Sequence, residues 1–190
     1  QNNTYEPDER SEDEITNNFN EQARILNPYV DFFYFDVWSS IKEFQCGIEA
    51  IKEFKKPYLI GIHISEGTSL PSGEKISDIK GILDDQLLGV MLSCVSPENF
   101  EKNLIELKNL NVPFGFKLNG FMTTKPKNGY TASYFKNSGG NPNEFLGQRH
   151  DLTPKKIGEI ARKFKDNGAT ILGGCCETRP SHIEAIAKIK

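Results

Sequence analysis

The sequence predicts an α/β protein in which helices alternate with the strands of a parallel sheet. Short, nearly continuous apolar runs, typical of strands buried on both faces, recur between segments with helical periodicity. The centres of the first four runs, near residues 33, 61, 91 and 115, lie roughly 30 residues apart, which is the length of a βαβ unit. A fifth run is centred near residue 171. Strict alternation of strand and helix places helices outside a parallel sheet.

Length and composition indicate a single domain spanning residues 1–190. Hydrophobic residues make up 37% of the chain, and 13 Phe, 6 Tyr and 1 Trp supply bulky core side chains. The net charge is −3, of which residues 1–14 carry −5, so the rest of the chain is close to neutral. We therefore expect no nucleic acid and no anionic membrane as a partner.

The chain is expected to be cytoplasmic. No apolar run approaches the ~20 residues of a membrane helix, and no signal peptide is visible. Four cysteines (Cys46, Cys94, Cys175 and Cys176) are too few for a disulfide framework, and a bridge between the adjacent pair would be strained. Metal or thiol chemistry is the expected use of any cysteine that does more than pack.

The first helix is predicted over residues 13–26. Ser11 with Glu14 three residues later forms a capping box, which marks its start. One face carries apolar side chains, and Asn27-Pro28 ends the helix. The side chains of that face are Ile15, Phe19, Ala23 and Leu26.

The remaining elements follow the same order of strand and helix. Strands are predicted over residues 30–37, 58–64, 88–94, 112–118 and 169–173. Further helices are predicted over residues 40–54, 74–85, 97–110, 153–165 and 180–190. Thr153-Pro154 begins the helix that Asn167-Gly168 ends.

Residues 119–150 have no clean period and are rich in Gly, Asn, Lys and Pro, so we interpret them as a long functional loop. Five parallel strands fit either an open doubly wound sheet or part of a (β/α)8 barrel, and periodicity alone does not choose between them. In both architectures the chemistry lies at the carboxyl ends of the strands.

Candidate site residues stand at these carboxyl ends. Asp36 ends the first strand, Cys94 ends the third, and Gly173-Gly174 leads from the last strand into Cys175 and Cys176. Three thiols are typical ligands of a catalytic zinc that keeps its fourth position open. Because neighbouring strand residues point to opposite faces, Cys175 and Cys176 can share one ion only where the strand has become a turn. The alternatives are that the cysteines pack as small hydrophobic residues or that the adjacent pair does redox chemistry.

Three segments at strand ends carry a family resemblance. Residues 173–183, Gly-Gly-Cys-Cys-Glu-Thr-Arg-Pro-Ser-His-Ile, resemble the C-terminal signature of the homocysteine S-methyltransferase family, and residues 89–94 resemble its other metal-binding strand. Phe35-Asp36 is similar to a pair whose carboxylate holds the amino group of homocysteine. The sequence departs from the pattern at Ser93, where Asn is usual, at Glu177, where Gly or a basic residue is usual, and at Asp36, where Glu is usual.

The resemblance implies a (β/α)8 TIM-type barrel of which this chain provides about the last five units, without the Asp-Gly-Gly-type segment that helps grip homocysteine. It implies zinc as the cofactor, held by Cys94, Cys175 and Cys176, with Asp36 binding the substrate. It also implies methyl transfer from a sulfonium or ammonium donor to homocysteine, giving methionine. The alternative is an incomplete or non-catalytic zinc-binding relative.

Five other side chains are candidates for lesser roles. We expect His63 to be a core histidine, His150 to be exposed, and His182 to cap the last helix or support the cysteine turn. Tyr34 and Trp38 flank Asp36, where aromatic rings could contact a cationic donor, although barrel core is the default for Tyr34. Five strands leave two sheet edges exposed, and such edges favour a homo-oligomer unless upstream residues complete the barrel.

Overall fold

The computed structural model describes residues 6–64, 66–123 and 146–189. Most of the loop predicted over residues 119–150 therefore lies outside the described residues. Within the described ranges, no helix combines the length and the apolar composition needed to cross a lipid bilayer.

Five parallel strands form one sheet in the order of the sequence, β1-β2-β3-β4-β5. Each strand lies beside its neighbours in the chain, whereas a doubly wound sheet reverses its order at a switch point. Progressive order is that of a barrel wall, and it decides between the two architectures that periodicity left open. The strands are β1 (Phe33–Trp38), β2 (Tyr58–His63), β3 (Leu87–Val95), β4 (Phe114–Leu118) and β5 (Ile171–Gly174).

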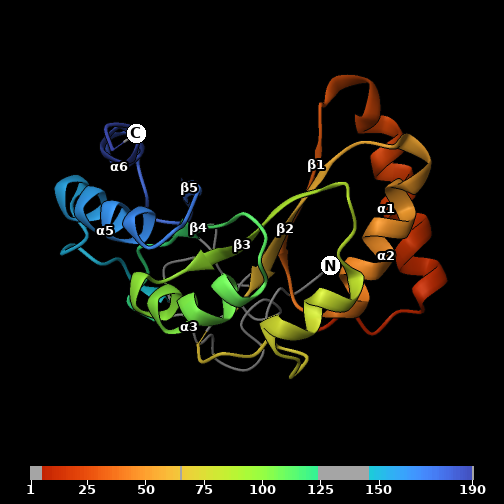
Figure 1. Cartoon of the computed structure of the whole chain (residues 1–190), viewed down its shortest axis with the longest axis horizontal. Helices are drawn as coiled ribbons and strands as arrows, with labels where there is room; N and C mark the ends of the chain where they lie inside the picture. Colours follow the sequence, from red (N-terminus) through yellow and green to blue (C-terminus); the bar gives the residue numbers. More distant parts are fainter. Residues whose placement is uncertain (1–5, 65, 124–145, 190) are drawn as a thin grey trace, which may run out of the picture.

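The helices lie along the outside of this sheet, with α1 beside α2 at the β1 end and α5 beside α6 at the β5 end (Figure 1). Hydroxyl side chains cap four of them as expected of helix starts: Ser11, Ser40, Ser96 and Thr153. The helices are α1 (Glu12–Leu26), α2 (Ile41–Ile51), α3 (Pro97–Asn109), α5 (Pro154–Asp166) and α6 (Pro180–Ala187). Two short 3₁₀ turns, η1 (Asn27–Tyr29) and η2 (Lys52–Phe54), follow α1 and α2.

One predicted helix has a different form. Residues 74–85 were expected to be α-helical, but the segment folds as the 3₁₀ helix η3 (Ile76–Ile82). Ile76, Ile79 and Ile82 recur every third residue, which is the spacing that lies on one face of a 3₁₀ helix. Ile76 and Ile79 are fully buried, so packing favours the tighter winding. Leu26, the last residue of α1, is 49% exposed but lines the same pocket as Phe19 and Ala23, as the predicted apolar face requires.

The two faces of the sheet differ in character. Alternate side chains pack against the helices and form the core: Phe33, Phe35, Tyr58, Ile60, Ile62, Val90, Leu92, Phe114, Phe116 and Leu118. The opposite, inner face carries smaller and more polar residues, among them Gly61, Ser93 and Lys117. Gly61 is required here, because a Cβ would lie 2.5 Å from Ser93 Oγ and 2.8 Å from the Tyr34 hydroxyl, which hydrogen-bond to each other across it.

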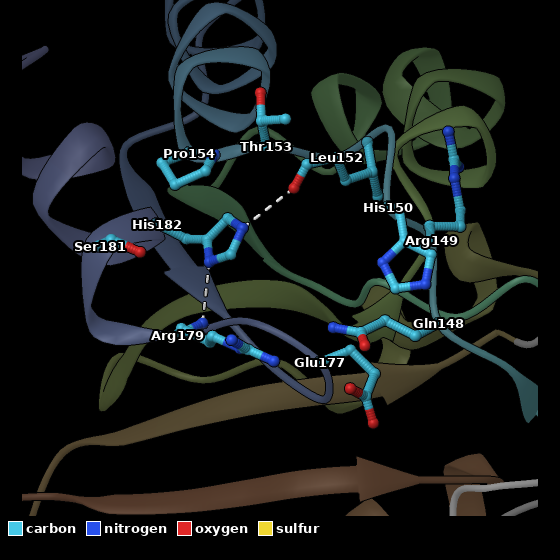
Figure 2. A pocket seen from close by; sticks show the side chains of 10 residues that line it. All are labelled: Gln148, Arg149, His150, Leu152, Thr153, Pro154, Glu177, Arg179, Ser181 and His182. Atoms are coloured by element: carbon cyan, nitrogen blue, oxygen red, sulfur yellow. Dashed lines mark hydrogen bonds between the residues drawn. The ribbon is translucent and has the colours of Figure 1, made fainter.

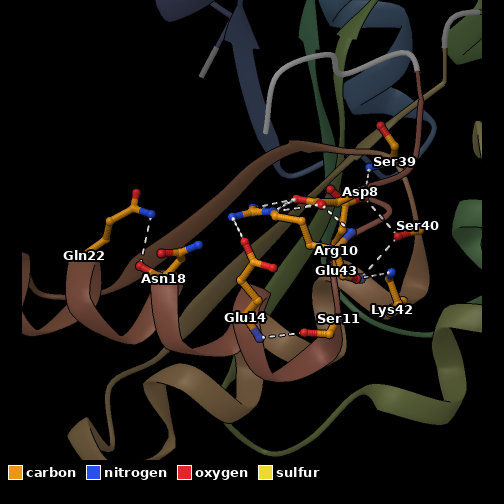
Figure 3. A network of polar contacts seen from close by, with 10 residues as sticks. All are labelled: Asp8, Arg10, Ser11, Glu14, Asn18, Gln22, Ser39, Ser40, Lys42 and Glu43. Atoms are coloured by element: carbon orange, nitrogen blue, oxygen red, sulfur yellow. Dashed lines mark hydrogen bonds and ion pairs between the residues drawn. The ribbon is translucent and has the colours of Figure 1, made fainter.

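A polar network fastens the N-terminal segment to the first two helices (Figure 3). The Asp8 carboxylate accepts hydrogen bonds from Arg10 at 2.7 and 3.0 Å, and the Arg10 guanidinium lies 3.8 Å from Glu14 of α1. Lys42 Nζ of α2 donates to the Arg10 carbonyl at 3.1 Å. The acidic segment is thereby docked where α1 and α2 begin.

Candidate metal centre

Three thiols meet at the carboxyl end of the sheet. The sulfur atoms of Cys94, Cys175 and Cys176 all lie within 4.8 Å of one another. Cys94 Sγ is 3.7 Å from Cys176 Sγ, and Cys175 Sγ is 3.9 Å from Cys176 Sγ. Sulfur ligands at about 2.3 Å around a tetrahedral zinc ion lie about 3.8 Å apart. The thiol positions therefore fit a three-sulfur site for zinc.

A bulge in β3 turns Cys94 toward the other two thiols. Cys94 has φ 56°, in the left-handed region, and the β3–β4 register shifts between Ser93 and Val95. On a regular strand the residue after the inward-facing Ser93 would point to the helices. The bulge breaks this alternation and leaves the thiol at the end of the inner face.

A turn after β5 brings the adjacent cysteines to one side, as the sequence predicted. The Cys175 amide still donates to the Leu118 carbonyl of β4 at 2.7 Å, and the Cys176 carbonyl accepts from the Gly120 amide at 2.9 Å. The Thr178 hydroxyl donates to the Cys175 carbonyl at 2.5 Å and closes the turn. Position 174 requires glycine in this turn, because a Cβ there would lie 2.5 Å from the hydroxyl oxygen of Thr178.

Asn119 is a site residue that sequence reasoning missed. It is fully buried, and its amide nitrogen lies 2.5 Å from the Cys94 carbonyl and 3.7 Å from Cys94 Sγ. Its side-chain oxygen accepts from the Phe121 amide at 3.2 Å. Asn119 follows β4 directly, so its place at a strand end was the signal that could have identified it.

The three thiols share negative charge. Hydrogen bonds from the Cys176 and Cys94 thiols lower the pKa of Cys175 to about 3, and the positive charge of Lys117 lowers it further. The same hydrogen bonding raises the pKa of Cys94, whereas the bond with Cys175 raises that of Cys176 to about 11. This distribution corresponds to one thiolate stabilised by two thiols.

Asp36 lies beside Lys117 on the inner face. Lys117 Nζ is 2.5 Å from Asp36 Oδ2 and 5.3 Å from the centre of the Tyr34 ring. The other carboxylate oxygen, Oδ1, is buried and makes no hydrogen bond with the described residues. The cation that contacts the Tyr34 ring is therefore the ammonium group of Lys117.

Trp38 does not face the site. The residue before it, Val37, has φ 62°, and the β1–β2 register shifts between Phe35 and Trp38. The indole ring consequently turns to the helices, where it stacks on the Phe19 ring with 4.4 Å between the ring centres. The interpretation of Trp38 as an aromatic contact for a donor is not supported by this packing.

The histidines take the lesser roles that the sequence predicted. His182 lies in the first turn of α6, where its Nδ1 accepts from the Arg179 amide at 2.9 Å, while its Nε2 lies 2.9 Å from the Leu152 carbonyl (Figure 2). These two contacts fix the orientation of the ring, which links the start of α6 to the segment before α5. His63 is buried in the sheet, and burial lowers its pKa to about 4. His150 is exposed, and Cys46 is buried in α2, outside the thiol cluster.

Comparison with known proteins identifies the family of the chain. The sequence model described as Homocysteine S-methyltransferase matches residues 1–189. The chain belongs to this family.

Curated relatives and solved structures resemble the chain over part of their length. Homocysteine S-methyltransferase 1 of Zea mays is 27% identical, and the match covers 84% of this chain and 46% of the maize protein. The Saccharomyces cerevisiae protein of the same name is 30% identical, and the match covers 70% of this chain and 39% of the yeast protein. The metallated form of the homocysteine methyltransferase MmuM from Escherichia coli aligns with TM-score 0.66 and 17% identity, over 98% of this chain and 55% of the other. Its oxidized form gives TM-score 0.68.

These alignments confirm the fold class, because the neighbours are TIM barrels and the five-stranded wall matches about half of one. The chain spans about half the length of the curated relatives it matches.

Proposed function

We propose that this chain carries the metal centre of a zinc-dependent methyltransferase, which moves a methyl group from a sulfonium or quaternary ammonium donor to the thiol of homocysteine and gives methionine. The observation that carries the proposal is the trio of sulfur atoms within 4.8 Å at the carboxyl ends of β3 and β5. Cys94, Cys175 and Cys176 would hold the ion. Zinc bound there supplies a fourth, open position at which a substrate thiol is held as its thiolate.

The residues of the chain have positioning roles in this reaction. Asn119 holds the backbone of Cys94, and the turn closed by Thr178 holds Cys175 and Cys176. Asp36 Oδ1 is an acceptor for the substrate ammonium group, which fixes the direction from which the thiolate attacks. The substrate sulfur forms a bond to the methyl carbon while the bond from that carbon to the donor atom breaks, and the electron pair stays with the donor. The donor loses its positive charge and no proton moves in this step.

The second candidate is a zinc-binding relative without catalytic activity. It is favoured by the departures from the family pattern at Asp36, Ser93 and Glu177. A chain with an intact thiol trio and an altered substrate site would bind metal without completing the reaction.

Two measurements separate these functions. Zinc content is determined on protein purified under reducing conditions, and methionine formation from homocysteine is assayed with S-methylmethionine, S-adenosylmethionine and betaine. About one zinc per chain with methionine formation supports the methyltransferase. One zinc without activity supports the second candidate, and no zinc under reducing conditions contradicts both.

A further inference from the structure

Lys117 is the one lysine of β4 and lies on the inner face, and it is not among the thiol ligands of the metal centre. Its side chain is 21% exposed, and its ammonium group is bound to Asp36 from β1, 81 residues away in the sequence. Asp36 is the one hydrogen-bond partner that its Nζ has among the described residues. A lysine ammonium has three N–H donors, so two of them are available to a ligand.

Asp36, the partner of Lys117, has a carboxylate oxygen that accepts no hydrogen bond from the described residues. Asp36 uses Oδ2 to accept from Lys117, and its Oδ1 is buried without a hydrogen bond to the described residues. A buried carboxylate oxygen without a donor is costly, and native proteins normally satisfy such atoms. The pair thus presents the Asp36 Oδ1 acceptor next to the N–H donors of Lys117 that Asp36 does not use.

This arrangement matches the head of an α-amino acid. An α-amino acid carries an ammonium group and a carboxylate on one carbon atom, and each group can meet its opposite in the Asp36–Lys117 pair. We propose that Lys117 is a substrate-specificity residue that binds the carboxylate of the thiol substrate while Asp36 binds the ammonium group. This inference rests on the proposed function, because it assigns the head-group contacts of the same substrate.

The pair lies close enough to the thiols for one substrate to reach both. Lys117 of β4 is paired in register with Gly173 of β5, two residues before Cys175. The same proximity suggests another role, in which Lys117 only balances the negative charge of the thiol cluster. A charge-balancing lysine would act on every thiol ligand equally, whereas a carboxylate-binding lysine acts only on ligands that have a carboxylate.

Three ligands distinguish these roles: homocysteine, 3-aminopropane-1-thiol, which lacks the carboxylate, and 4-mercaptobutyric acid, which lacks the ammonium group. Binding is measured by calorimetry on zinc-loaded protein of residues 1–190. We expect Lys117→Met to weaken homocysteine and 4-mercaptobutyric acid about ten- to a hundred-fold and to leave 3-aminopropane-1-thiol unchanged. Asp36→Asn should weaken homocysteine and 3-aminopropane-1-thiol by a similar factor and leave 4-mercaptobutyric acid unchanged.

The controls use the same protein. Lys163→Met removes a surface lysine that lies 2.5 Å from Glu101, the same separation as in the Asp36–Lys117 pair, and should change none of the three affinities. Lys117→Arg keeps the charge and should restore most of the homocysteine affinity. If Lys117→Met does not fold, the unaltered protein still tests the idea, because it should bind homocysteine at least tenfold more tightly than 3-aminopropane-1-thiol.

Two results would overturn the inference alone: equal weakening of all three thiols by Lys117→Met, or equal affinity of the unaltered protein for homocysteine and 3-aminopropane-1-thiol. If the unaltered zinc-loaded protein bound none of the three thiols, the proposed function itself would fail, and the inference with it.

Discussion

Three residues at or just beyond the carboxyl ends of strands, Val37, Cys94 and Glu177, have left-handed backbone conformations, with φ values of 62°, 56° and 60°. This region disfavours residues other than glycine by about 1–2 kcal/mol each. At Val37 and Cys94 the conformation accompanies a register shift that reorients a side chain at a strand end. Backbone strain of this kind gathers where side chains must leave the regular alternation of a strand.

Glu177 has φ 60°, a left-handed conformation that glycine adopts without strain. We predict that Glu177→Gly stabilises the protein by about 0.5–1 kcal/mol, since relief of the left-handed conformation exceeds the added freedom of the unfolded chain. Urea unfolding with saturating zinc measures this. Glu159→Gly, in the exposed middle of α5, should instead destabilise by about 1 kcal/mol. A loss of stability in Glu177→Gly would contradict the explanation.

The cysteines have separable roles. We predict that Cys176→Ser removes most of the zinc, because its thiol lies within 4 Å of each of the other two, whereas Cys46→Ser keeps about one zinc per chain. Cys46 is the matched control because it is buried in α2, away from the cluster. Zinc is measured by atomic emission on protein kept under reducing conditions. Equal zinc in the two variants would refute the assignment of the ligands.

Asn119 should matter for metal affinity although it is not a ligand. Asn119→Ala removes the hydrogen bond to the Cys94 carbonyl and is expected to weaken zinc binding about 10- to 100-fold, as is typical when a group that orients a ligand is lost. The zinc affinity of each variant is measured by competition with a chelator of known zinc affinity. Asn17→Ala, at an exposed position of α1, is the control, and an unchanged affinity in Asn119→Ala would show that Cys94 is held by the strand alone.

The elements are stabilised by caps and by short polar networks. Arg10 lowers the pKa of Asp8 from 3.8 to about 2, chiefly through side-chain hydrogen bonds, in the network that docks the N-terminal segment on α1 and α2 (Figure 3). A carboxyl group whose pKa falls on folding stabilises the folded state above its unfolded pKa and loses this contribution as the pH falls through the folded value. Asp8 therefore contributes stability above pH 3.8 that disappears toward pH 2.

The corresponding prediction compares Asp8→Asn with the unaltered chain. The difference in free energy of unfolding should be constant above about pH 5 and should shrink as the pH falls from 3.8 to about 2. Chemical denaturation at a series of pH values follows it, with Asp85→Asn, an exposed acid, as the control. A pH-independent difference would mean that Asp8 acts by packing alone.

At the scale of the whole molecule, the described sheet has two edges, β1 and β5, each paired on one side. Apolar side chains lie near both. Phe32 before β1 is 43% exposed, and Ile183 of α6 is 44% exposed beside an apolar pocket that includes Leu172 of β5. Exposed parallel edges favour pairing with another chain.

We predict that residues 1–190, produced alone, associate through these edges. Light scattering should give a mass at least twice 21.4 kDa. Ile183→Glu should shift the population toward the monomer, whereas Ile105→Glu, at a 72% exposed position on α3, should not. A well-folded monomer would contradict this prediction.

The sequence alone determined the succession of strands and helices, the helix caps at Ser11 and Thr153, and the candidate ligands Cys94, Cys175 and Cys176. These features depend on local periodicity, on hydroxyl side chains at helix starts, and on residue types at strand ends, all of which can be read within a short stretch of chain. The sequence also placed Asp36 at a strand end, but it gave no sign of the partner of that carboxylate.

Only the tertiary structure decided the strand order, the 3₁₀ form of η3, and the position of Asn119 against Cys94. It also decided that Lys117 meets Asp36 across 81 residues of sequence. Each of these depends on which segments become neighbours when the sheet curves, and on small backbone departures such as the left-handed Cys94. Local sequence preference does not contain such contacts, because their free energy arises from groups that come together only in the folded chain.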